Sequence, residues 1–351
     1  MPKYLFLSIC IALFSCSGND EVAYRVITPH GTTGGTAKAT PLAGRNFGPV
    51  GEFGYLTDIL LVGELIVVKD DKHQNVFHVI REEEELAFSF QELGDGPDRI
   101  DDPSFVKVTG YDQRADKLYL FSYKTKSIAS LGIHKDSTIT KIFNIPGNYW
   151  SEVQSAALIG DTTVALTGLF ADTKFYLLDP NSGAIVVKAA NNNPFEGSFS
   201  EAQLIRMSPR NIHYNDKHNL VVLQNTSLNA LYVYDVSGTP RKYYSFGELN
   251  NVTSEGEFMP NYFYYYSTKT QEDIVYSLYL GVDQKRLTLQ EMSVNFIDSE
   301  LHLYDLISDE MRRFSLDRMV NVCVVDSGQK FVYCIDENNE DQPLVKYEIP
   351  E

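Results

Sequence analysis

The chemistry open to this sequence is best sought where charged side chains gather beside glycine and proline. The densest such group comprises Asp95, Asp98, Arg99, Asp101 and Asp102. Carboxylates and a guanidinium group at this spacing suit recognition of a sugar or a basic peptide, or binding of a cation. Aspartate also shapes turns and caps, because its side chain accepts hydrogen bonds from nearby backbone N–H groups. The sequence leaves both interpretations open.

Four further candidates lie in or beside glycine- and proline-containing segments: Trp150, Glu196, Glu255 and Glu257. The indole ring of Trp150 offers a flat apolar surface that can stack on a sugar ring, with packing between structural units as the alternative. Segments held by a rigid scaffold are where recognition tends to reside.

Motifs for phosphate, metal or nucleophilic chemistry fail at specific positions. Residues 30–38 are rich in Gly and Thr but lack the Gly-Lys-Ser/Thr ending of a phosphate-binding loop. His213 and His218 are five residues apart, unlike the spacing of four that places two histidines on one helix face. We therefore expect no cofactor and no metal, and the sequence assigns no catalytic residue.

The charge balance restricts the partners. The 351 residues contain 30 Lys and Arg against 47 Asp and Glu, a formal net charge of −17. An acidic surface repels phosphate backbones, so we expect no nucleic-acid partner.

The N-terminal segment predicts export. An apolar run from Tyr4 to Phe14 follows Lys3 and is about half as long as a membrane-spanning helix, which is typical of a signal peptide. The run ends at Leu13-Phe14-Ser15-Cys16, which resembles the bacterial lipobox, so Cys16 is the expected site of lipidation. The segment that follows, Ser17-Gly18-Asn19-Asp20-Glu21, resembles the acidic tag that sends lipoproteins of Bacteroidetes-type bacteria to the cell surface, with a periplasmic tether as the alternative.

Two cysteines, Cys323 and Cys334, lie in the expected folded part of the chain and flank a tight turn at 326–329. If Val325 pairs with Lys330, the two thiols share a face only diagonally, at about 7–8 Å. That separation exceeds comfortable disulfide reach. We expect two buried free thiols, and a disulfide is the alternative.

Apolar runs recur in pairs along the chain and define a repeat. The leading runs are Leu65–Val68, Leu118–Phe121, Thr163–Leu166, Leu220–Leu223, Val275–Tyr279 and Lys330–Tyr333. Three of the partner runs end at Asp179, Asp235 and Asp305, where aspartate suits a turn. The runs are apolar on both faces, which is typical of strands covered on both sides. The repeat thus predicts an all-β fold, a single six-bladed β-propeller of four-stranded antiparallel blades.

The last unit is one strand short of a complete blade. We expect an N-terminal strand at 22–27 to supply it and close the ring. The predicted organisation is a signal peptide at 1–15, a lipid-anchored tether at 16–45 and the propeller at 46–351.

Strand direction predicts where the candidate residues gather. In a four-stranded antiparallel blade, the loop between the second and third strands lies at the same end as the loop into the next blade. We call this end of the ring the loop-rich face, and we expect the nine candidate residues to lie there.

Several short motifs resemble those of the TolB-like six-bladed β-propeller lipoproteins of Bacteroides and related bacteria. Gly94-Asp95-Gly96-Pro97-Asp98 is similar to a loop that follows the first blade in that family. Residues 276–281 and 303–305 resemble its later strands. The resemblance covers most of residues 46–350 and implies the propeller and the lipid anchor. It implies no reaction, because a shared fold does not carry function.

These observations favour a non-catalytic lipoprotein of the outer membrane, at its cell-surface or periplasmic face, that binds a glycan or a protein at the loop-rich face. Two alternatives remain: a lyase or hydrolase that acts on polysaccharide, and a scaffold for envelope assembly. We expect the chain to be monomeric and its membrane contact to be made through the lipid.

Overall fold

The computed structural model describes residues 25–27, 38–81, 85–94, 99–160, 162–190, 200–206, 208–225, 230–245, 262–283, 299–336 and 338–350. Within these ranges the regular secondary structure is almost entirely strand, with one α-helix of six residues, α1 (Glu201–Arg206). Two single 3-10 turns, η1 (Pro103–Phe105) and η2 (Gly147–Tyr149), lie in connections between blades. The all-β prediction is confirmed.

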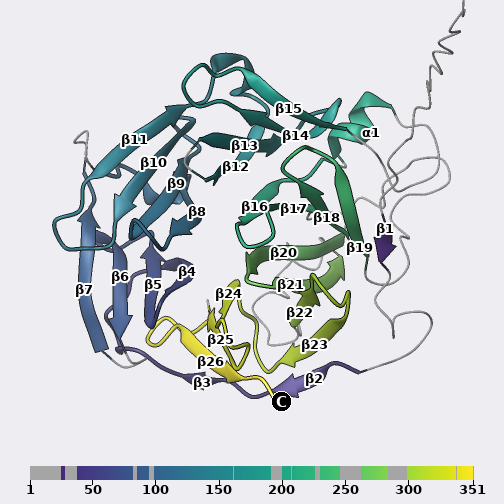
Figure 1. The fold of residues 1–351 in the computed structure, drawn as a ribbon. Coiled ribbons are helices and arrows are strands. Elements are labelled where there is room, and N and C mark those ends of the chain that lie inside the picture. Colours follow the sequence, from purple (N-terminus) through teal and green to yellow (C-terminus); the bar gives the residue numbers. More distant parts are fainter. Residues whose placement is uncertain are drawn as a thin grey trace, which may run out of the picture.

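Six sheets surround one axis, each with four antiparallel strands, and in five of them the strands follow sequence order from the axis outward (Figure 1). Blade I contains β4 (Leu56–Val62), β5 (Leu65–Asp70), β6 (Asn75–Arg81) and β7 (Glu85–Glu92). Blade II contains β8 (Val106–Asp112), β9 (Lys117–Ser122), β10 (Ser127–Gly132) and β11 (Ile139–Asn144). Blade III contains β12 (Val153–Ile159), β13 (Thr163–Gly168), β14 (Thr173–Leu178) and β15 (Ile185–Ala190). Blade IV contains β16 (Asn211–Asn215), β17 (Leu220–Asn225), β18 (Ala230–Asp235) and β19 (Pro240–Ser245). Blade V contains β20 (Tyr262–Gln271), β21 (Ile274–Asp283), β22 (Glu300–Asp305) and β23 (Met311–Leu316). Blade VI contains β24 (Val322–Val325), β25 (Phe331–Ile335), β26 (Leu344–Glu348) and, from the other end of the chain, β3 (Arg45–Asn46). The predicted paired runs lie in the second and third strands of the six blades.

The core lies between the blades. Successive residues of β14 and β17 are buried on both faces of their sheets, as the continuous apolar runs predict. The buried side chains form clusters that each join neighbouring blades, such as blades I and II around Phe77 and Leu120, or blades III and IV around Phe175 and Tyr234. Each blade is therefore stabilised mainly by its neighbours, which explains why the ring has to close.

Aspartates at strand ends organise the turns, as predicted. The carboxylate of Asp179 accepts a hydrogen bond from the backbone N–H of Asn181, at 2.9 Å. Asp305 accepts two such bonds, from Ile307 and Ser308, at 2.8 and 2.7 Å. These bonds satisfy backbone donors that the sheet leaves unpaired.

The predicted closing strand is wrong in its position. Ring closure is made by β3, whose Asn46 and Arg45 pair antiparallel with Val345 and Lys346 of β26. β3 leads into β4 through nine residues, so the outer strand of blade VI joins the inner strand of blade I as in every other blade. A strand at 22–27 would have to close the blade through a much longer connection.

The predicted segment instead contributes to another blade. β1 (Arg25–Ile27) adds a fifth, parallel strand to β19 of blade IV, and β2 (Thr40–Leu42) adds one to β23 of blade V. With β3, the N-terminal segment thus follows the outer edges of three successive blades (Figure 1). This arrangement covers edge strands that would otherwise expose unpaired backbone groups.

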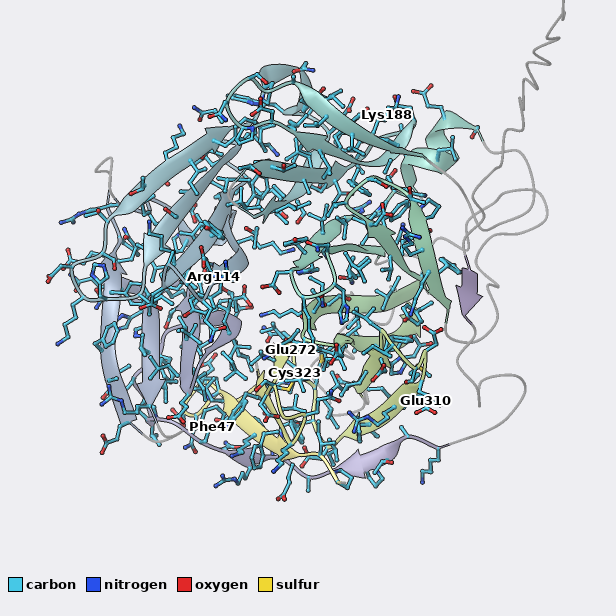
Figure 2. The ribbon with its side chains drawn as sticks, in the orientation of Figure 1. Phe47, Arg114, Lys188, Glu272, Glu310 and Cys323 are labelled. Atoms are coloured by element: carbon cyan, nitrogen blue, oxygen red, sulfur yellow. A yellow bond between two sulfur atoms is a disulfide. The ribbon has the colours of Figure 1, made fainter. Side chains whose placement is uncertain are left out.

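The expectation of two free thiols is also wrong. Cys323 and Cys334 are directly opposite each other on β24 and β25 and form a disulfide (Figure 2). The expected register fails because the turn is longer: Asp326 pairs with Phe331, and its carboxylate accepts the backbone N–H groups of Lys330 and Phe331. Val325 therefore pairs with Val332, which brings the Cα atoms of the two cysteines to 4.1 Å.

Candidate functional site

Four of the nine candidate residues lie within the described ranges: Arg99, Asp101, Asp102 and Trp150. The other five, Asp95, Asp98, Glu196, Glu255 and Glu257, lie outside them, as does the lipidation residue Cys16. All four described residues belong to connections between blades, from β7 to β8 or from β11 to β12. The antiparallel order of the strands places both connections on the loop-rich face.

The charged residues of this group are engaged locally. The guanidinium group of Arg99 lies 3.3 Å from the carboxylate of Glu92, and both side chains are about half exposed. Asp101 forms an ion pair with Lys124, whose hydrogen bond lowers the pKa of that carboxyl. Exposed ion pairs of this kind contribute little to stability.

Asp102 has the capping role that was the structural alternative. Its Oδ1 accepts hydrogen bonds from the backbone N–H and the hydroxyl of Ser104, at 3.1 and 2.5 Å. These bonds start the 3-10 turn η1, whose first residue is Pro103. Asp102 therefore shapes the connection between blades I and II.

Trp150 is held in place while much of its ring stays exposed. The indole Nε1 donates a hydrogen bond to the carbonyl oxygen of Ile145 at 2.6 Å, and the residue is 49% exposed. The backbone N–H of Ile145 donates in turn to the carbonyl oxygen of Lys126, in the loop between the second and third strands of blade II. A fixed, half-exposed aromatic ring thus lies on the loop-rich face, where the sequence predicts it.

A buried carboxylate that the sequence reasoning missed connects two loops of this face. Asp70 accepts the backbone N–H groups of Gly54, Tyr55, Lys72 and His73 at 2.6 to 3.0 Å. Burial alone would raise the pKa of Asp70, but its contact with His78 and these backbone bonds lower it well below the ordinary value. Asp70 thereby fixes the entry to blade I against the loop between β5 and β6.

A second polar group lies at the axis. In the inner strand β16, Ile212 is buried, whereas Asn211 and His213 on either side of it are partly exposed. In β8, Lys107 is partly exposed and Val108 is buried. Since alternate residues share one face of a strand, Asn211 and His213 point the same way.

Two hydrogen-bonded pairs join blades that are not neighbours. Lys107 of blade II donates to the side-chain carbonyl of Asn211 in blade IV. Lys269 of blade V donates to Oδ1 of Asp58 in blade I, at 2.7 Å. The two blades that each bond connects are separated by another blade around the ring. The bonded side chains therefore reach across the central axis. Asp58, Lys107, Asn211, His213 and Lys269 are called the axial cluster below.

The axial cluster carries more positive than negative charge. Burial lowers the pKa of Lys107 to about 8, with a further lowering by Lys269 that Asp58 opposes. Burial, together with Lys107 and Lys269, holds the pKa of His213 well below its ordinary value, so its ring is neutral at pH 7. Two lysines thus face one carboxylate in a chain whose overall charge is strongly negative.

Most of the axial cluster lies toward the loop-rich end of the ring, whereas Lys269 is the eighth of the ten residues of β20. Asp58, Lys107 and Asn211 lie within the first three residues of β4, β8 and β16. The inner strand of each blade begins at the loop-rich face, so these side chains lie near it. No single motif reveals the cluster, because its members come from four blades. The available signal is a polar residue near the start of the first strand in several repeats.

Among the described residues, no three His, Cys, Asp or Glu side chains converge as metal ligands would. In that same part of the chain, no helix has the length and apolar character needed to cross a bilayer.

Solved structures share this fold. An exported protein of Bacteroides fragilis NCTC 9343 matches with a TM-score of 0.58 and 12% identity, over 93% of this chain and 99% of that chain. A member of the DUF4221 family from Bacteroides vulgatus ATCC 8482 matches with a TM-score of 0.50 and 11% identity, over 89% and 96%. A Bacteroides thetaiotaomicron VPI-5482 protein of unknown function matches with a TM-score of 0.50 and 11% identity, over 87% and 75%.

At these identities the likeness shows the propeller fold alone. Neither a family model nor a curated protein matches the sequence.

Proposed function

We propose that this chain is an exported, lipid-anchored propeller of the bacterial outer membrane that binds a glycan at its loop-rich face without catalysing a reaction. The observation that carries the proposal is Trp150, an indole fixed by its N–H bond to Ile145 and left half exposed. Apolar ring faces of sugars stack on such surfaces, and a pre-fixed side chain loses little entropy on binding.

Three observations support export. The Cys323–Cys334 disulfide suits an oxidising compartment, because such bonds are rare in reducing cytosol. A Bacteroides fragilis exported protein shares the fold. The N-terminal sequence resembles a lipoprotein signal that ends at Cys16, and the short motifs resemble those of TolB-like propeller lipoproteins.

The fold suggests how the lipid would hold the ring. Arg25, the first residue of β1, follows Cys16 by nine residues, a reach of at most about 30 Å. β1 pairs with the outer strand of blade IV, so the anchor would attach at the rim and leave the loop-rich face accessible.

The purified full chain in detergent tests glycan binding directly, because Trp150 is the only tryptophan of the sequence. We expect one class among neutral (laminarin, dextran) and acidic (polygalacturonate) oligosaccharides to change its emission saturably and protect it from acrylamide quenching. Trp150→Ala should weaken binding, measured by calorimetry, by roughly tenfold or more, which corresponds to about 1.4 kcal/mol.

The matched control is Ile307→Ala, which removes an exposed apolar side chain, 68% exposed, from the loop between β22 and β23 on the opposite face. This variant should bind as the wild type does. Binding that survives the loss of Trp150, or no emission change with any oligosaccharide, would contradict the proposal. Among the residues that the structure describes, no observation favours the lyase, hydrolase or scaffold alternatives.

A further inference from the structure

We propose that the axial cluster binds an oxyanion, a carboxylate or phosphate group, between Lys107, Lys269 and His213. The proposal concerns a second site and does not depend on glycan binding at Trp150. Its geometric basis is the pair of bonds that reach across the axis, from blade II to blade IV and from blade V to blade I. The charges of Asp58 and Lys269 act on Lys107, and those of Lys107 and Lys269 act on His213, so the two bonded pairs lie close together.

The ammonium group of Lys107 has hydrogen-bonding capacity to spare. It can donate three hydrogen bonds, and within the described ranges its acceptor is the neutral carbonyl of Asn211. A partly buried ammonium with a neutral partner lacks the anion that usually compensates it. Because Lys107 remains partly exposed, an anion from solution can supply the missing partner.

The second lysine does not remove this imbalance. Lys269 donates to Asp58 and to the carbonyl oxygen of Ile59, so the carboxylate of Asp58 is already paired. The positive charge of Lys107 is therefore not balanced by the carboxylate of the axial cluster. An oxyanion would neutralise it and accept hydrogen bonds from several donors at once.

His213 adds an adaptable donor at the same place. It follows Asn211 by two residues on β16 and shares its side of the strand. Within the described residues no hydrogen bond engages its ring, and a neutral imidazole can donate one N–H to an anion.

Proton linkage gives the site a signature that a purely structural lysine would lack. The pKa of Lys107 is about 8, under the combined influence of burial, Lys269 and Asp58, with Asn211 and His213 as its other neighbours. A bound anion stabilises the charged form and raises this pKa. Binding between about pH 8 and 9 should therefore take up a fraction of a proton per anion.

The test is isothermal titration of the full chain with inorganic phosphate and, separately, with galacturonate, at constant ionic strength in chloride. We expect saturable binding of one anion per chain with a dissociation constant below about 10 mM. The tighter of the two titrations identifies the preferred group. At pH 8.5, buffers of different ionisation enthalpy should reveal the proton uptake.

Three variants make the result specific to Lys107. Lys107→Met should weaken binding by roughly tenfold or more. Lys107→Arg should bind with little or no proton uptake, because arginine stays charged. Lys124→Met removes the same charge from an exposed ion pair on the loop-rich face and should bind as the wild type does.

Circular dichroism and the unfolding temperature without ligand show whether each variant is folded. If Lys107→Met does not fold, the Lys107→Arg comparison still decides the question. Absence of saturable binding for both probes, equal binding by folded Lys107→Met, or unchanged proton uptake by Lys107→Arg would overturn the proposal.

Discussion

The side chain of Lys174 shows how one residue can lower the stability of this fold. Lys174 lies on β14 in the interface between blades III and IV, fully buried, with its ammonium 5.0 Å from the centre of the Tyr232 ring. Its Nζ has no hydrogen-bond acceptor among the described residues. Burial lowers the pKa of Lys174 from 10.5 to about 7.

This shift predicts a pH-dependent stability. In the unfolded chain Lys174 keeps its proton up to about pH 10.5, whereas in the folded chain it loses the proton above about pH 7. The folded state is therefore penalised at and below neutral pH, and the penalty disappears as the pH rises toward 10.5.

Lys174→Met should stabilise the protein at pH 7 by roughly 2–4 kcal/mol, after allowance for the lost cation–π contact. The advantage should shrink toward zero at pH 10.5. Urea unfolding at the two pH values measures it. Equal stability of variant and wild type at pH 7 would show that the folded protein accommodates the charge.

At the residue scale, the sequence predicts the structural role of a side chain better than the residues that it contacts. The turns at Asp179 and Asp305 followed from residue type, because aspartate bonds its own local backbone. The ion pair of Asp101 with Lys124 and the burial of Lys174 depend on how segments far apart in sequence pack. No local pattern encodes those contacts.

Among the elements, β3 is only two residues long, yet it completes blade VI. Side chains from the loop after β23 hold it in place by hydrogen bonds. The guanidinium group of Arg318 donates to Asn46 Oδ1 at 2.7 Å and to the carbonyl oxygen of Gly44 at 3.2 Å. The carboxylate of Asp317 accepts the backbone N–H of Gly44 at 3.1 Å.

A side chain at Gly44 should loosen this closure. A Cβ atom there would lie 2.5 Å from Val345 and 2.8 Å from Tyr347, both buried in β26. Gly44→Val is expected to lower the free energy of unfolding by about 1–3 kcal/mol, the usual cost of overpacking. Urea unfolding measures this loss.

Gly147→Val serves as the control, since nothing lies within 4 Å of a Cβ at that position. Its unfolding midpoint should stay close to that of the wild type. A Gly44→Val variant as stable as this control would argue against β3 as the closing strand.

The incorrect predictions of the closing strand and of two free thiols have one cause. Strand existence followed from apolar periodicity, but pairing depended on loop lengths that periodicity does not report. The turn after Val325 is longer than expected, which converts a diagonal pair of cysteines into a directly opposite one. Likewise, the segment that closes the ring is determined by the short link between β3 and β4. The apolar pattern at 22–27 does not report that link.

For the whole molecule, the sixfold repeat was sufficient to predict the architecture, because blades buried on both sides need neighbours all round. The axial cluster could not be predicted in the same way. Lys107 and Asn211 are 104 residues apart and meet only once the ring is closed. The position of Trp150 on the loop-rich face followed from strand alternation, whereas its exposure did not.

Retention of glycan by membranes tests the central claim most directly. Outer-membrane fragments from cells that produce the wild type, Trp150→Ala or Cys16→Ala are incubated with the labelled oligosaccharide that changes the Trp150 emission, and the bound label is measured after pelleting. We predict retention by wild-type fragments. We predict loss with Trp150→Ala at equal protein content, and loss with Cys16→Ala because the protein leaves the membrane. Retention by Trp150→Ala fragments at the wild-type level would contradict the account.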